Sequence, residues 1–255
     1  MKSKIDINNE IEKLIDYKLS KGEEFNKNEI EFISKYTGWG GTKQAGKVGL
    51  IHEFFTPQYI CKFMYDLAIK YGYNKGNILE PSAGIGAMIK EFYDTNNYKT
   101  ITVFEISKYS SEIIKAIYPK IEVFNNFFET AFLEYPRFST INSKGLTWLN
   151  NYPYDLVIGN PPYSKNVNLY SSYFKKPIKF KQAEMFFIFK GLQLLKQGGI
   201  LIYITSSNFL SSGLESYYNE KNEIGKLAEL LEAIRLPSIF DNTGVPTDII
   251  ILKKK

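Results

Sequence analysis

The segment Val157–Ser164 holds the residues best suited to chemistry in this sequence. Its consecutive prolines, Pro161 and Pro162, fix φ and remove two backbone donors, so the loop is rigid. The Asn160 carboxamide oxygen and the Pro161 carbonyl are then fixed acceptors, and Tyr163 is a flat ring beside them. Two acceptors above an aromatic ring can hold an exocyclic amino group whose base stacks on the ring. The alternative is a Pro-Pro turn that only ends a strand.

A second segment, Glu80–Gly86, joins an apolar run to a helical pattern. Gly84 and Gly86 allow a tight turn and a close approach of a ligand to the backbone. About twenty residues later Glu105 ends the next apolar run, where a carboxylate can hold ribose hydroxyls. The glycine spacing departs from the full dinucleotide fingerprint. A plain strand-to-helix turn is the alternative, but the two features together favour a nucleoside ligand.

Both segments must be positioned by the elements around them, which alternate between short apolar runs and helical stretches. The expected strands are Asn77–Glu80, Thr100–Glu105, Ile121–Phe124, Tyr154–Gly159, Gly199–Thr205, Leu227–Arg235 and Asp248–Leu252. The expected helices are Pro57–Tyr71, Ala87–Asp94, Lys108–Tyr118 and Ala183–Leu195. This alternation predicts an α/β fold with a doubly wound, mostly parallel sheet, ending in an antiparallel C-terminal hairpin at one edge. Ligands bind such sheets beyond the carboxyl ends of the strands.

The first fifty residues differ in pattern from the rest. Residues 1–35 predict two amphipathic helices, and Asn26 with Glu29 resembles a capping box before the second. The stretch Tyr36–Gly46 is too rich in glycine for a helix. We therefore expect a helical extension and a Gly-rich loop in residues 1–50, and the main domain in residues 51–255.

Composition excludes several classes of protein. The single cysteine, Cys61, and the single histidine, His52, rule out a disulfide framework, a Cys-based zinc cluster and a two-His metal site. The sequence contains no uninterrupted apolar stretch of ~18 residues, so no membrane span is expected. The N-terminus lacks the apolar region of a signal peptide. We expect a cytoplasmic protein without metal.

Several motifs resemble those of one family. Asn160–Tyr163 resembles the signature tetrapeptide of the N6-adenine DNA methyltransferases, and Glu80–Gly86 is similar to their Glu-Pro-x-Ala-Gly-x-Gly cofactor motif. His52–Pro57 resembles the segment that precedes this motif in the gamma arrangement, and Tyr36–Gly46 resembles a segment of large adenine methylases of plasmids and phages. The resemblance covers most of the chain. It implies a Rossmann-like methyltransferase fold, S-adenosylmethionine as methyl donor and an adenine amino group as acceptor.

The resemblance also implies roles for individual positions. The residues near the methionine end of the cofactor would be Thr56, Pro57, Glu80, Ala83, Gly84 and Gly86. Glu105 would bind the ribose hydroxyls, and Asn126 and Phe127 would lie at the cofactor's adenine. Asn126 stands where an Asp is common, so its amide oxygen would accept without charge. Phe240 would cover the other face of the target base, unless it only fills the core.

The implied reaction sets clear chemical demands. The adenine amino group is a poor nucleophile because its lone pair is delocalised into the ring. Hydrogen bonds from both amino protons to the Asn160 and Pro161 oxygens would localise that lone pair for in-line transfer of the methyl group. Positioning and electrostatics can supply the rate enhancement without a covalent intermediate. The target base must leave double-stranded DNA, and stacking on Tyr163 offsets part of that cost.

Positive charge gathers behind the tetrapeptide. The net charge is +5, and residues 161–255 hold 13 basic and 8 acidic side chains. An acid-free stretch follows the tetrapeptide and contains Lys165, Lys175, Lys176, Lys179 and Lys181. We interpret it as a flap that contacts DNA phosphates, the alternative being a solvated face. Since only Arg137 and Arg235 are arginines, bidentate reading of guanine is hardly available.

The source of DNA specificity stays open between three possibilities. Short insertions such as Ser164–Ala183 and Ser206–Lys226 could supply it, a partner subunit could, or the chain could be a fragment of a larger protein. The biological setting, restriction-modification, regulation or anti-restriction, is equally open.

Two other functions remain compatible with the motifs. The same tetrapeptide occurs in enzymes that methylate a glutamine amide in translation release factors, although their glycine motif usually differs. The chain could also be a non-catalytic, DNA-binding relic or subunit of a methyltransferase. The intact glycines, Glu105 and Asn160–Tyr163 argue against a relic.

Overall fold

The computed structural model describes most of the chain. The described residues are 3–39, 55–132, 154–163, 180, 182–210, 218–238 and 246–255. Within these ranges no helix is both long and apolar enough to cross a bilayer.

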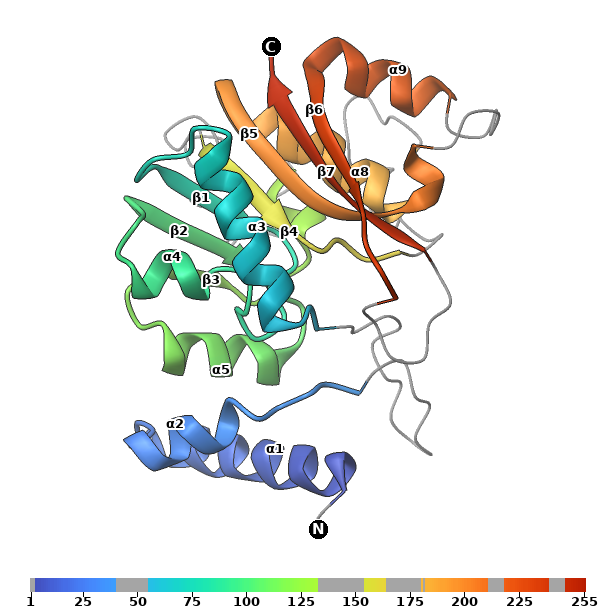
Figure 1. Cartoon of the computed structure of the whole chain (residues 1–255). Helices are drawn as coiled ribbons and strands as arrows, with labels where there is room; N and C mark the ends of the chain where they lie inside the picture. The colour runs from blue at the N-terminus through green and yellow to red at the C-terminus, as the bar shows by residue number, and fades with distance from the viewer. Residues whose placement is uncertain are drawn as a thin grey trace.

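A twisted sheet forms the centre of the molecule (Figure 1). Its strands are β1 (Asn77–Glu80), β2 (Thr100–Phe104), β3 (Glu122–Phe124), β4 (Tyr154–Gly159), β5 (Leu195–Ser206), β6 (Ala228–Arg235) and β7 (Thr247–Lys254). They lie in the order β3-β2-β1-β4-β5-β7-β6. The first five are parallel, and β7 runs antiparallel to both β5 and β6. The expected doubly wound sheet with an antiparallel C-terminal hairpin is confirmed.

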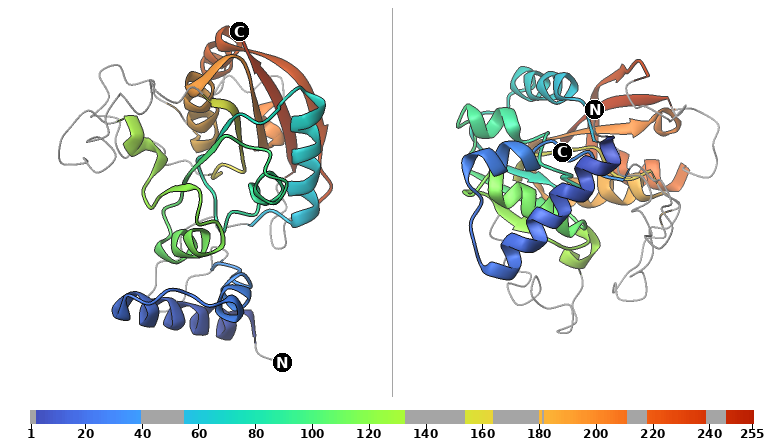
Figure 2. Two further views of the ribbon diagram at one scale, coloured as in Figure 1. Left: turned by 90° about the vertical axis from the view of Figure 1, so that its left-hand side faces the viewer. Right: turned by 90° about the horizontal axis from the view of Figure 1, so that it is seen from below.

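Helices cover both faces of this sheet (Figure 2). The helices are α1 (Lys4–Lys21), α2 (Lys27–Ile33), α3 (Gln58–Lys70), α4 (Lys90–Asp94), α5 (Lys108–Ile117), α8 (Ala183–Leu194) and α9 (Tyr218–Leu227). Short 3₁₀ turns are η1 (Phe128–Phe132) and η4 (Ser207–Phe209). Side chains of α3, α4 and α5 pack on one face, and those of α8 and α9 pack on the other.

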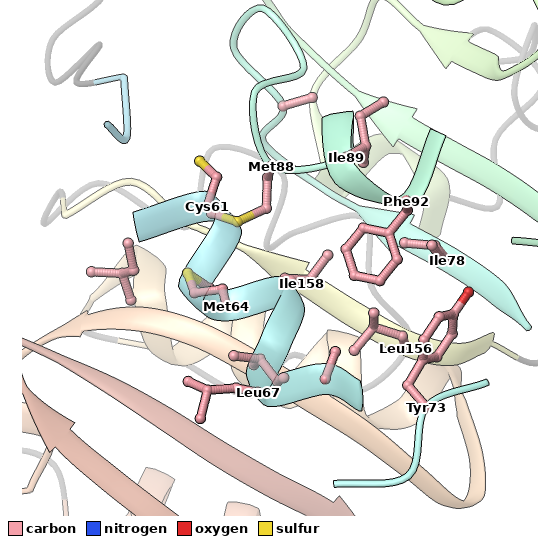
Figure 3. Close-up of a cluster of buried hydrophobic side chains, with 14 of the residues drawn as sticks. Cys61, Met64, Leu67, Tyr73, Ile78, Met88, Ile89, Phe92, Leu156 and Ile158 are labelled. Atoms are coloured by element: carbon pink, nitrogen blue, oxygen red, sulfur yellow. The ribbon is translucent and has the colours of Figure 1, made fainter. Parts of the chain in front are cut away.

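The buried strands show why the alternation predicted this fold. Successive side chains of a strand point to opposite faces. In β4, Leu156 and Ile158 pack with the α3 side, and Val157 packs with the α8 side. All three are fully buried. Figure 3 shows the α3 side of this core, where Met64 of α3 and Phe92 of α4 lie over the strands. A strand buried on both faces has an uninterrupted apolar sequence.

The starts of two expected elements differ from the structure by several residues, and one helix was not expected. The helix expected from Ala87 begins only at Lys90, because the turn after β1 continues to Ile89. The strand expected from Gly199 begins at Leu195, which pairs with Tyr154 of β4 before a break in register. Helix α9 was not expected, since only Glu220 and Ile224 of its residues are buried. So sparse an apolar pattern does not predict a helix.

The N-terminal helices form as expected. Asn26 caps α2: its side chain accepts from the Glu29 amide at 3.0 Å, and the Glu29 carboxylate accepts from the Asn26 amide at 2.8 Å. Helices α1 and α2 pack against α5 and form a further layer beside the main domain (Figure 1). The expected domain boundary near residue 50 lies outside the described residues, so that division remains a prediction.

Replacing Phe92 by Ala tests the α3-side core. Its fully buried ring makes edge contacts with Tyr65 and Tyr73, at centroid distances of 4.8 and 5.4 Å. Loss of a buried Phe costs about 3–5 kcal/mol because a cavity remains. We expect denaturant unfolding to report a loss of this size. Tyr59→Ala, at a position 63% exposed on α3, is the control and should change stability little. Equal losses in the two variants would contradict this packing.

Candidate functional site

The carboxyl ends of β1, β2 and β4 meet at one edge of the sheet, and hydrogen bonds tie their loops together. The Ala83 amide donates to the Phe104 carbonyl at the end of β2, at 3.0 Å. The Ser82 hydroxyl donates to the Asn160 carbonyl after β4, at 3.1 Å. The turn after β1 is thus fastened on one side to β2 and on the other to the loop that carries Asn160–Tyr163.

A hollow opens where these loops meet, with about 330 Å³ of free space, part of it open to solvent. Its lining residues are Phe55, Thr56, Glu80, Ser82, Ala83, Gly84, Ile85, Ala87, Met88 and Asn160. The Asn160 amide nitrogen lies 3.4 Å from the Thr56 hydroxyl. Segments far apart in sequence therefore supply one site, as the motifs predicted. Four lining residues were not expected: Phe55, Ile85, Ala87 and Met88. The sequence could have indicated them only through their nearness to Thr56 or to Gly84 and Gly86.

The two glycines of the turn serve different purposes. Both have positive φ, 56° at Gly84 and 79° at Gly86. A Cβ at Gly84 would lie 2.9 Å from the Phe55 ring, beside the hollow, whereas a Cβ at Gly86 would lie 2.7 Å from the Tyr118 ring. Only Gly84 lines the hollow. Gly86 instead permits close packing of the turn against Tyr118.

Glu80 gives the hollow its electrostatic character. The side chain is 2% exposed, and among the described residues its Oε2 has no hydrogen-bond partner. Burial, and secondarily the nearby Glu105, raise the pKa of the Glu80 carboxyl well above its usual value. A buried carboxylate without a partner is costly. A cationic group in the hollow would provide that partner.

Glu105 acts on the backbone in this structure. One carboxylate oxygen accepts from the Gly84 amide and the other from the Ser107 amide, each at 2.7 Å. The carboxylate therefore holds the glycine turn against the end of β2. Its implied contact with ribose hydroxyls remains a prediction.

The remaining cofactor candidates lie near the hollow without lining it. The Asn126 amide oxygen accepts from the Phe127 amide at 2.9 Å, and Phe127 is 37% exposed. Asn125, the residue before Asn126, donates to the Glu105 carbonyl at 2.9 Å and joins this loop to the end of β2. Pro57 directly precedes α3. The roles of Asn126, Phe127 and Pro57 remain predictions.

Asn160 and Tyr163 do come together, but through a contact that we did not expect. The Tyr163 hydroxyl lies 2.6 Å from the Asn160 amide oxygen and 3.2 Å from the Ile204 carbonyl. A hydroxyl has one proton, so it donates to one of these oxygens at a time. Burial raises the pKa of Tyr163 well above its usual value, and Glu184 adds to this. The hydroxyl therefore stays protonated and donates either to Asn160 of its own loop or to Ile204 of β5.

Glu184 supports the Tyr163 loop through the end of β5, and its role was not expected from the sequence. It is 3% exposed, and its two oxygens accept from the Ser206 amide at 2.9 Å and the Ser206 hydroxyl at 2.7 Å. Burial raises the pKa of Glu184, and the bonds from Ser206 oppose this rise. The available signal was a lone acid in the apolar helix Ala183–Leu194. The pair fixes the end of β5 beside Ile204.

Several candidates lie outside the described residues. They are Phe240, Lys165, Lys175, Lys176, Lys179 and Lys181. Pro161 and Pro162 are described and follow β4 directly, as the motif predicted.

The hollow fits S-adenosylmethionine at its methionine end. The cofactor carries a positive ammonium and a positive sulfonium there, and the buried Glu80 oxygen is an acceptor that no described residue pairs with. Gly84 lines the hollow beside the Phe55 ring, which packs against the turn where a side chain would otherwise lie.

Comparisons with known proteins identify the family of the chain. The model of the Eco57I restriction-modification methylase family matches residues 60–236. The type II methyltransferase M.HincII of Haemophilus influenzae is 30% identical over 217 residues, covering 79% of this chain and 36% of that protein. Defense against restriction protein B of Escherichia phage P1 is 28% identical over 230 residues, covering 88% of this chain and 9% of that protein. The chain thus spans about a third or less of these relatives.

Solved structures agree on the fold. A protein from Listeria monocytogenes, assigned to the class I S-adenosylmethionine-dependent methyltransferases, has a TM-score of 0.64 and 17% identity, covering 90% of this chain and 69% of its own. A protein from Vibrio vulnificus, assigned as the modification subunit of a type I restriction enzyme, has a TM-score of 0.65 and 17% identity, covering 91% and 51%. The expected methyltransferase fold is confirmed. Since the family model matches well over half of its residues, this chain belongs to the Eco57I restriction-modification methylase family.

Proposed function

We propose that this chain transfers a methyl group from S-adenosylmethionine to the N6 amino group of an adenine flipped out of double-stranded DNA. The observation that carries the proposal is the position of Asn160, which lines the same hollow as Glu80 and Gly84. An amino group held by the Asn160 amide oxygen would therefore lie next to the methionine end of the cofactor. That proximity is what in-line transfer requires.

Roles in cofactor binding follow from the site. Glu80 would pair with the positive ammonium, and the turn at Gly84 would form part of the wall beside the cofactor. When bound, the cofactor supplies an activated methyl group on sulfur. The flanking positions proposed to complete the site are Thr56, Pro57, Ala83, Gly86, Glu105, Asn126 and Phe127. Among these, Thr56 and Ala83 line the hollow itself.

The Tyr163 hydroxyl has two acceptors, and this suggests how Asn160 is released for the substrate. When Tyr163 donates to the Ile204 carbonyl instead of Asn160, the amide oxygen can accept one proton of the target amino group. The Pro161 carbonyl would accept the other. The Tyr163 ring then stacks against the base, which offsets part of the cost of flipping.

DNA as substrate is supported by the names of the relatives and by charge. Two relatives carry the names of restriction-modification methyltransferases, and the flap that we propose to contact phosphates holds Lys165, Lys175, Lys176, Lys179 and Lys181. We propose that Phe240 covers the face of the target base opposite Tyr163. Since lysines on phosphates carry no sequence information, we propose that further parts of a longer protein, or a specificity subunit, select the site.

The direct test uses labelled S-adenosylmethionine and duplex DNA, followed by digestion to nucleosides. We expect the label in N6-methyladenine. Replacing adenine by 2-aminopurine, which lacks the 6-amino group, is the matched control and should remove it. Label in cytosine would reject the adenine specificity, and label in a release-factor glutamine would favour the amide alternative.

Asn160→Ala should lower methyl transfer by about 10²–10³-fold, the usual effect of removing one group that stabilises the transition state. Binding of S-adenosylhomocysteine should change little, because the contact of the Asn160 amide with the Thr56 hydroxyl in the hollow is long, at 3.4 Å. Tyr163→Ala should also lose transfer, whereas Tyr163→Phe keeps the stacking ring and should retain it. Equal losses in both Tyr163 variants would assign the function to the hydroxyl and contradict stacking.

Glu80→Gln should raise stability and weaken cofactor binding. Burial raises the Glu80 pKa in the folded state, so its contribution to stability is complete below the unfolded value and is lost as pH rises through the folded value. At neutral pH the neutral glutamine should therefore raise Tm, by about 2–4 °C for each kcal/mol gained. Affinity for S-adenosylhomocysteine should fall by roughly ten- to a hundredfold.

Calorimetry and thermal melts across pH 4–9 check both effects, with the exposed Glu229→Gln as the control. A variant with lower Tm and unchanged affinity would remove Glu80 from the site.

Glu184→Ala should lower kcat by about tenfold to a hundredfold while leaving cofactor affinity unchanged, because it displaces the end of β5 and with it the Tyr163 loop. Glu184→Gln keeps an oxygen that can accept from Ser206 and should restore most of the rate. Steady-state kinetics with calorimetry separate the two quantities. Equal rates in Glu184→Ala and the parent would show that this support is not needed.

A further inference from the structure

The N-terminal helices lie outside the part of the chain that the family model matches, yet their core reaches the cofactor hollow. Ile11, Ile15 and Ile33 are fully buried and pack with Ile113 of α5. The partly buried members of the same cluster include Phe55 and Ile85. Both also line the hollow. One apolar cluster therefore connects α1 and α2 with the wall of the proposed cofactor site.

Two buried polar side chains of α1 fix the segment that follows α2. Asn8, 2% exposed, donates to the Gly38 carbonyl at 2.6 Å and accepts from the Thr37 amide at 3.1 Å. Glu12, 4% exposed, accepts from the Tyr36 hydroxyl at 3.0 Å and from the Trp39 ring nitrogen at 2.6 Å. Buried polar groups that are fully paired rigidify the segment they bind.

Tyr36 carries this rigidity to the hollow. Its ring is 2% exposed and lies 6.4 Å from the Phe55 ring, centroid to centroid, at an angle of 46°. On its other side Phe55 rests on the glycine turn, since a Cβ at Gly84 would lie 2.9 Å from the Phe55 ring. The Phe55 ring is thus held between Tyr36 and Gly84.

We propose that the helical unit of residues 3–39 is a working part of the cofactor site, in which Tyr36 holds Phe55 against Gly84 and so sets the shape of the hollow. Tyr36, Asn8 and Glu12 are positioning residues, because they act through Phe55. The ligand affected is the methionine end of a nucleoside sulfonium cofactor. This inference rests on the proposed cofactor site and is independent of which methyl acceptor the chain uses.

The first experiment measures S-adenosylhomocysteine binding to the full chain by calorimetry. Tyr36→Leu removes the aromatic contact and should weaken binding by about three- to tenfold, the size of one aromatic pair. Tyr36→Phe keeps the ring, loses the hydroxyl that bonds to Glu12, and should rescue most of the affinity. Tyr17→Ala, at a 53% exposed position of α1, is the control and should bind like the parent.

A double-mutant cycle separates positioning from general stability. If Tyr36 acts through Phe55, Tyr36→Leu should have little further effect on affinity in a Phe55→Leu background. Thermal melts confirm that each variant is folded. Additive losses in the cycle, or a folded Tyr36→Leu protein with unchanged affinity, would overturn the inference.

Hydrogen exchange on the unaltered chain gives a test that needs no variant. By linkage, saturation with S-adenosylhomocysteine should slow exchange at the Tyr36–Trp39 amides. The amides of α9 serve as a remote reference. Unchanged exchange at Tyr36–Trp39 would overturn the inference. A chain that binds the cofactor product but fails to methylate adenine would instead reject the proposed acceptor and leave this inference standing.

Discussion

The carboxylate of Glu105 bonds the Gly84 amide and thereby fixes the turn after β1 to the end of β2. Much of the site depends on that bond. It fixes the glycine turn beside the Phe55 ring, while Ser82 bonds the same turn to the Asn160 loop. Parallel strands alone bring their carboxyl ends to one edge. The side-chain bonds between their loops convert that edge into a hollow with fixed walls.

Fixing the turn in this way places two carboxylates close together in a buried environment. Glu105 accepts from backbone amides, whereas Glu80 has an oxygen without a partner in the part of the chain that the structure describes. The folded protein therefore carries an electrostatic cost that a cationic ligand can relieve. Strain of this kind is common where binding matters more than stability. Glu184, like Glu105, is a buried carboxylate with bonded oxygens. Both of its oxygens accept from Ser206, and the side chain supports the end of β5.

Sequence reasoning reached the fold and the main residues of the hollow for identifiable reasons. β1 and β4 were expected with their observed bounds, because strands buried on both faces are continuous apolar runs ended by Glu80 and Asn160. The hydrogen bond from the Tyr163 hydroxyl to Asn160 could not be predicted from the sequence, because it depends on where β5 places the Ile204 carbonyl. Nor could the position of Tyr36 beside Phe55, because these rings meet only through the packing of α1 and α2 on α5.

The central claim is that Asn160 and the methionine end of the cofactor share one hollow. A crystal structure of the chain with S-adenosylhomocysteine tests it most directly. We expect the ammonium of the ligand to lie within hydrogen-bond distance of Glu80, and the sulfur of the ligand to be directed toward the Asn160 amide oxygen. A ligand bound elsewhere on the sheet, or a sulfur directed away from Asn160, would contradict it.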